Sequence, residues 1–153
     1  MGIFSFLTKK QDWFTPAEHE AIVEAIRAAE KRTSGEIRLF VESRCSYVDP
    51  VHRAAEVFFG LQMDKTEDRN GVLLYIAMKD HQLAVFGDQG IHEKVGTAFW
   101  NEEVKKMLAS FGKQHYAEGI VQIVTEIGSA LVHHFPYESE DRNELPDDIV
   151  FGR

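Results

Sequence analysis

The sequence predicts an α/β fold, and more closely a three-layer α/β/α sandwich around a central mixed sheet. Gly71 to Met78 is an almost unbroken apolar run, too short to span a membrane and bounded by turn residues. Such a run is typical of a central strand covered on both faces. Lys79 and Asp80 then turn the chain, so that residues 83–86 return beside this strand as an antiparallel hairpin strand. Helical and strand patterns alternate along the chain, as they do in α/β domains.

The first helix and the first strand are marked by local signals. A Thr-Pro-Ala-Glu stretch at 15–18 has the layout of a capping box with proline at the first helical position. Ile22, Ile26 and Ala29 then recur at helical spacing. Residues 36–43 alternate between apolar and polar side chains, which predicts a strand. A right-handed crossover would make this strand parallel to the central one, giving a parallel pair plus the hairpin strand.

Three further helices complete the expected order of elements. Asp49 and Pro50 open a second helix by the same capping logic, and its apolar face runs to Leu61. After the hairpin, residues 86–91 (Phe-Gly-Asp-Gln-Gly-Ile) are expected to form an acidic, glycine-rich loop. A third helix covers the region from Trp100 to Phe111, and a fourth, after Gly112, covers 116–131.

The chain of 153 residues fits one ordinary domain with a single core. We divide it into an N-terminal tail (1–13), an α/β domain (14–136) and an acidic C-terminal tail (137–153). About half of the net charge of −8 lies from Pro136 onward, where six acidic residues face two arginines. This tail can still fold against the domain through Leu145, Ile149 and Phe151.

Charge and cysteine content exclude several classes of protein. No stripe of Lys and Arg is present to displace counterions from phosphates, so nucleic acid is not an expected partner. Cys45 is the only cysteine, so an intrachain disulfide is impossible.

A short apolar patch near the N-terminus fits neither a signal peptide nor a membrane span. Its lysines follow the patch, and no small-residue cleavage site appears. We therefore expect a cytoplasmic protein that is not itself transmembrane. The patch is then a loose or docked tail, with weak contact to a membrane surface as the alternative. Its apolar residues are Ile3, Phe4, Phe6 and Leu7.

Oxygen-bearing side chains are expected to gather at one end of the sheet. A tight hairpin returns the chain to the end where it started, so Asp88 should lie near Asp68 and Asn70. Glu36, at the start of a parallel strand, should lie at the same end. Hard cations prefer carboxylate, amide and carbonyl oxygens, so we predict a Ca²⁺ or Mg²⁺ site there. Its candidate ligands are Asp64, Asp68, Asn70, Asp88 and Glu36, with Glu67 and Glu93 close in sequence.

The same residues also fit a purely structural interpretation. Asp68 and Asn70 are good turn formers, and the remaining acids can simply be solvated. The stretch 66–71 looks like the start of an EF-hand loop, but Ala77 stands where the closing bidentate glutamate is needed. An EF-hand is therefore excluded.

Four segments in order resemble the TPM domain family, and in particular its short, soluble bacterial form. They are the helix end and strand start at 31–38 (Lys-Arg-Thr-Ser-Gly-Glu-Ile-Arg), the strand at 70–74 (Asn-Gly-Val-Leu-Leu), the loop at 86–91 and the tail motif at 143–147 (Asn-Glu-Leu-Pro-Asp). The resemblance implies an α/β/α sandwich. For some members it implies binding of a divalent metal, usually calcium, and for a plant thylakoid branch an acid phosphatase activity.

Two functions of different classes remain open at this point. The first is a non-catalytic, divalent-metal-binding interaction or accessory module with an unidentified protein partner, a membrane-associated partner being one option. The second is a weak metal-dependent acid phosphatase. Phosphatase chemistry has less support, because no Asp-x-Asp pair follows a strand and no glycine-rich phosphate loop is present. A phosphatase that used Cys45 would need an arginine six residues later to hold the phosphate, but Val51 stands at that position.

Overall fold

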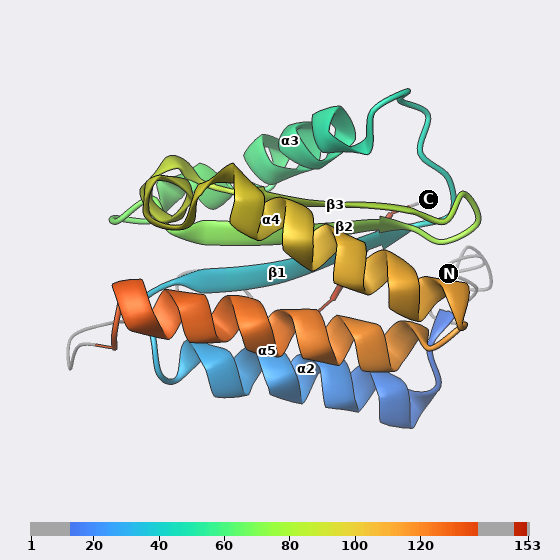
Figure 1. Cartoon of the computed structure of the whole chain (residues 1–153), viewed down its shortest axis with the longest axis horizontal. Coiled ribbons are helices and arrows are strands. Elements are labelled where there is room, and N and C mark those ends of the chain that lie inside the picture. Colours follow the sequence, from blue (N-terminus) through green and yellow to red (C-terminus); the bar gives the residue numbers. More distant parts are fainter. Residues whose placement is uncertain (1–12, 138–148, 153) are drawn as a thin grey trace, which may run out of the picture.

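The computed structural model describes residues 13–137 and 149–152, and these form a mixed sheet with helices on both faces (Figure 1). This arrangement is the α/β/α sandwich that the sequence predicts. In chain order the elements are α2 (Pro16–Glu30), β1 (Glu36–Glu42), α3 (Pro50–Gly60), the 3-10 helix η2 (Met63–Lys65), β2 (Gly71–Ala77), β3 (Gln82–Gly87), α4 (Gln89–Gly112), α5 (Tyr116–His134) and β4 (Val150–Phe151).

The sheet has the strand order β3-β2-β1-β4. β1 and β2 are parallel with Glu36 opposite Gly71, and β2 and β3 form the antiparallel hairpin. The parallel crossover pair and the hairpin strand are thus confirmed. β4 is an addition that the sequence pattern does not predict, and it pairs with β1 in parallel at Phe40 and Val41. Of the tail residues named above, Ile149 is buried and Phe151 packs against the core, whereas Leu145 lies outside the described residues.

Each face of the sheet carries its own apolar core. Figure 1 shows α3 above the sheet and α2 and α5 below it, while α4 runs obliquely from the sheet down toward α5. The buried side chains of α4 belong to the core on the α2 and α5 side. Because side chains alternate along a strand, Ile37, Leu39 and Val41 of β1 face the α2 and α5 side, whereas Phe40 faces the α3 side with Leu73 of β2. β2 is buried along its whole length, as its apolar run predicts.

The expected helix starts are present, and one element begins earlier than expected. Thr15 and Glu18 form the capping box of α2, and the Asp49 side chain accepts a hydrogen bond from the backbone N–H of Val51. The loop expected at 86–91 is wrong in its second half, because α4 already starts at Gln89 with Asp88 as its N-cap. Gly96, at φ 81°, then kinks this helix, which hides its continuity from a periodicity search.

No helix within residues 13–137 and 149–152 is long and apolar enough to cross a membrane. The N-terminal patch at residues 3–7 lies outside the described residues.

Candidate functional site

Two of the predicted ligand positions, Glu36 and Asp88, lie on either side of Gly71 in a row across one end of the sheet. Glu36 starts β1 opposite Gly71, the first residue of β2. On the other side of β2, the backbone N–H of Asp88 donates to the carbonyl of Gly71 at 2.9 Å. Since neighbouring strands lie about 4.8 Å apart, the backbones of Glu36 and Asp88 are about 10 Å apart with Gly71 between them. The convergence expected from the hairpin geometry is therefore seen at the backbone level.

A backbone carbonyl covers the middle of this row on the α3 side of the sheet. A Cβ atom at Gly71 would lie 3.0 Å from the carbonyl oxygen of Met63, so η2 packs directly on the glycine. This packing places Asp64, also in η2, over the same sheet end, where its charge contributes to raising the pKa of Arg69. The missing side chain at Gly71 is what lets η2 approach so closely.

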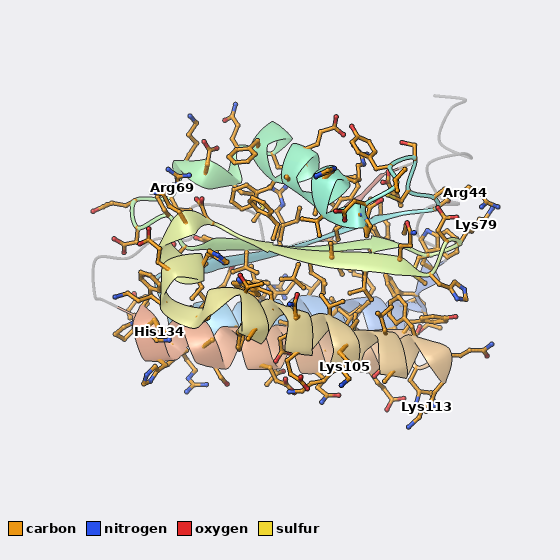
Figure 2. All side chains as sticks on the ribbon, turned by 45° about the horizontal axis from the view of Figure 1, so that its top comes forward. Arg44, Arg69, Lys79, Lys105, Lys113 and His134 are labelled. Carbon is orange, nitrogen blue, oxygen red and sulfur yellow. The ribbon has the colours of Figure 1, made fainter. Side chains whose placement is uncertain are left out.

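The Asp88 carboxylate is buried, and its main partner is Arg69. Arg69 Nε donates to Oδ2 at 2.7 Å and Nη2 to Oδ1 at 2.8 Å, a bidentate ion pair. Oδ1 also accepts from the backbone N–H of Gln89 at 2.8 Å, which caps α4. The hydrogen bonds with Asp88 are the main reason that the pKa of Arg69 is raised. Figure 2 shows Arg69 at this end of the sheet, with Arg44 and Lys79 at the opposite end.

Arg69 was not among the residues predicted for this site. The only sequence signal for it was a cation standing between Asp68 and Asn70, and that signal is weak. Arg69 has φ 52°, a left-handed conformation that closes the turn before β2. The turn then packs on the start of α4, where the backbone N–H of Gly90 donates to the Arg69 carbonyl at 2.8 Å.

Asn70 carries the most unusual polar atom of this sheet end. Its side chain is only 1% exposed, and its Nδ2 group donates to Ser34 Oγ at 3.2 Å. Its backbone N–H donates to Thr66 Oγ1 at 3.2 Å. Oδ1, by contrast, is buried without a hydrogen-bond partner among the described residues. A buried amide oxygen in that state costs free energy unless something else satisfies it.

The remaining candidates lie outside this buried group. Asp68, Glu67 and Glu93 are exposed, on the turn before β2 and on the outer surface of α4. Across residues 13–137 and 149–152, no three His, Cys, Asp or Glu side chains come close enough together to hold a metal ion. Any cation here would therefore depend on a mixed set of oxygens, from carboxylates, the Asn70 amide and the backbone.

Such a mixed set suits one kind of ligand. Glu36 and Asp88 are 2% and 3% exposed, so water has little access to either carboxyl group. Amide and carbonyl oxygens beside carboxylates match the preference of Ca²⁺ and Mg²⁺ and not that of softer metals.

The fold and this acidic sheet end define the class of protein: a small α/β/α module with buried oxygen atoms where β1 and β2 begin. Residues 7–130 match the family model for the TPM domain. The chain therefore belongs to the TPM domain family. No protein with a curated description matches it.

Solved structures that resemble this chain include two from bacteria. The BA42 protein of the psychrophilic bacterium Bizionia argentinensis shares 40% identity, with 91% of this chain and 95% of that protein covered and a TM-score of 0.83. The N-terminal domain of the cg2496 protein from Corynebacterium glutamicum shares 13% identity, with 77% and 74% covered and a TM-score of 0.56. The second likeness shows the fold alone.

Proposed function

We propose that this TPM domain is a non-catalytic accessory module that binds Ca²⁺ or Mg²⁺ at the acidic end of its sheet and acts on a protein partner in the cytoplasm. The observation that carries the proposal is the buried Oδ1 of Asn70, without a partner among the described residues, at the sheet end that also holds the buried side chains of Glu36 and Asp88. A buried amide oxygen without a donor is costly unless a cation or a hydrogen-bond donor compensates it.

Arg69 accounts for the stability of the site without a metal. Its guanidinium neutralises Asp88 from the solvent side, where 37% of its side chain is exposed. A divalent cation would compete with that guanidinium for the same carboxylate oxygens. Because few carboxylates cluster here, we expect weak binding, with a dissociation constant of about 10⁻⁴–10⁻³ M.

Titration of chelator-stripped protein with Ca²⁺ and Mg²⁺ is expected to move the backbone amide signals of residues 36, 64–70 and 88 in a saturable way. Asp88→Asn should weaken this binding about tenfold or more, since it removes a charge that faces the cation. Asparagine is as good an N-cap as aspartate, so α4 keeps its start. Two-dimensional amide NMR measures the dissociation constants of the wild type and of Asp88→Asn.

The matched control for this titration is Glu102→Gln, which removes one exposed carboxylate from α4. It should bind as the wild type does. Flat titrations of the wild type, or equal affinities of Asp88→Asn and the wild type, would remove the basis of the proposal.

Arg69→Gln is expected to increase the stabilisation that Ca²⁺ confers. The substitution takes away the guanidinium that competes for Asp88, so the variant should be less stable without metal and should gain more from it. The measurement is thermal unfolding with and without Ca²⁺ at about ten times the dissociation constant. At that concentration, linkage predicts that Ca²⁺ raises the free energy of unfolding of the wild type by about 1.4 kcal/mol. A smaller gain in Arg69→Gln than in the wild type would contradict competition at this carboxylate.

The phosphatase alternative is tested on the same samples. A metal-dependent phosphatase predicts hydrolysis of p-nitrophenyl phosphate that chelator abolishes and that Asp88→Asn reduces in parallel with metal affinity. A non-catalytic module predicts cation binding without turnover.

A further inference from the structure

An open apolar groove of about 430 Å³ runs between the N-terminal halves of α2 and α5. Figure 1 shows these two helices side by side, with their N-termini at the same end of the molecule. Ala17 and Ala21 of α2 line one wall, and Ala117 and Val121 of α5 line the other. Glu18 and Glu118 stand at its rim.

Small side chains line the groove at one end of the helix pair. At the far end the helices touch, since a Cβ at Gly128 would lie 2.7 Å from the Ala29 Cβ. Toward the N-termini, alanines leave the surface between the two helices unfilled. Contiguous exposed apolar surface of this kind marks docking sites in soluble domains.

The first described residues of the chain lie at one end of this groove. The first described residue, Trp13, and the buried Phe14 line a second hollow of about 100 Å³. That hollow shares Glu18, Ala117 and Glu118 with the groove, so the two are continuous. The residues before Trp13 therefore reach the described part of the molecule at the mouth of the groove.

Those preceding residues have the composition that the groove requires. Residues 3–7 read Ile-Phe-Ser-Phe-Leu, with four large apolar side chains in five positions. The six residues from Leu7 to Trp13 span up to about 20 Å when extended, compared with about 6 Å of helix from Ala17 to Ala21 along the groove. The family model also starts at residue 7, within this segment.

Charge agrees with the same occupant. Lys9 and Lys10 follow the apolar residues, and the groove rim offers Glu18 and Glu118, with Glu118 exposed. Opposite charges beside an apolar contact fix its orientation more than they add affinity.

We propose that residues 3–7 of this chain dock into the groove between α2 and α5, so that the N-terminal segment is an intramolecular ligand of the helical layer. This surface lies on the helical layer, away from the acidic end of the sheet, and the proposal does not depend on cation binding.

A nitroxide label placed within the segment tests this docking in the full chain. Ser5→Cys in a Cys45→Ser background gives one labelling position. Amides of Ala17, Ala21, Ala117 and Val121 should lose more than half of their signal relative to the reduced label. Amides of α3, on the opposite face of the sheet, should be unaffected. Absent or unfocused broadening would overturn the proposal.

Two helix variants make the test specific. Ala21→Lys puts a charge into the groove, whereas Ala28→Lys changes an exposed alanine on the same face of α2, seven residues on. Docking predicts that Ala21→Lys restores the lost signals and that Ala28→Lys does not, and the same behaviour of both variants would overturn it.

A mixed sample separates one chain from two. Spin-labelled chains without ¹⁵N are combined with ¹⁵N chains that carry no label. If the groove signals are lost in this sample, a second copy of the chain fills the groove and the intramolecular proposal fails. Unchanged signals there, together with broadening in the singly prepared sample, support it.

Discussion

Replacing Arg53 with methionine is expected to destabilise the domain by about 3–5 kcal/mol, because it leaves the buried carboxylate of Glu42 without its counter-charge. Glu42 ends β1 on the α3 side of the sheet and is 5% exposed. Arg53 Nε donates to Oε2 at 2.9 Å and Nη2 donates to Oε1 at 3.0 Å, so one guanidinium satisfies both oxygens.

Neighbouring groups tighten this pair. The fully buried Tyr75 hydroxyl also donates to Glu42 Oε2, and burial followed by this hydrogen bond raises the pKa of Tyr75. The guanidinium lies 5.6 Å from the centre of the Phe40 ring and also donates to Glu56 at the surface. The hydrogen bonds with Glu42 are the main reason that the pKa of Arg53 is raised.

The double variant Glu42→Gln with Arg53→Met should recover more than half of that loss, since no buried charge then remains. Chemical denaturation at pH 7 measures the free energy of unfolding of each of these variants. Glu56→Gln is the matched control, because it removes only the exposed partner and should cost about 1 kcal/mol or less. A double variant no more stable than Arg53→Met alone would show that the buried charge is not the cause.

The fold follows from signals that are local in the sequence. The Thr15 capping box, the Asp49 cap and the apolar run of β2 each lie within a few residues, and each correctly predicts its element. β4 could not be found in this way, because two residues carry it and its partner in β1 lies about a hundred positions earlier. The start of α4 was missed because Gly90 was assigned to a loop, and the kink at Gly96 interrupts the helical pattern that follows.

The placement of the candidate residues was predicted in part for the same reason. Strand direction alone brings Glu36, Asn70 and Asp88 to one end of the sheet, and that needs no knowledge of side-chain packing. The Arg69–Asp88 ion pair and the cover of Met63 over Gly71 depend on how η2 and the turn pack, which periodicity does not reveal. The Glu42–Arg53 pair was missed because β1 and α3 place its two members together only in three dimensions.

A second buried acid, Glu103, is expected to make the stability of the domain fall as the pH rises. Glu103 lies between α4 and α5 and is 4% exposed, and its Oε1 has no hydrogen-bond partner among the described residues. Burial, and then the neighbouring Glu126, raise the pKa of Glu103 to about 7. Lys106 opposes this only in part, with its Nζ 3.5 Å from Glu103 and 2.8 Å from Glu126.

The direction of the effect follows from where the proton is held. The unfolded chain releases it near pH 4.5, whereas the folded protein keeps it up to about pH 7. Between these values the folded state binds more protons, so the free energy of unfolding falls as the pH rises. Full ionisation costs on the order of 3 kcal/mol, because each unit of pKa difference corresponds to about 1.4 kcal/mol.

Glu103→Gln should therefore be as stable as the wild type near pH 4.5 and more stable by about 3 kcal/mol at pH 8, since glutamine fills the site without a charge. Urea denaturation at half-unit steps from pH 4.5 to 8.5 measures how the free energy of unfolding changes with pH in Glu103→Gln and in the wild type. Glu102→Gln, its exposed neighbour on α4, should keep the wild-type slope. Parallel curves for Glu103→Gln and the wild type would mean that Glu103 is ionised in the folded protein throughout this range, with Lys106 holding its charge.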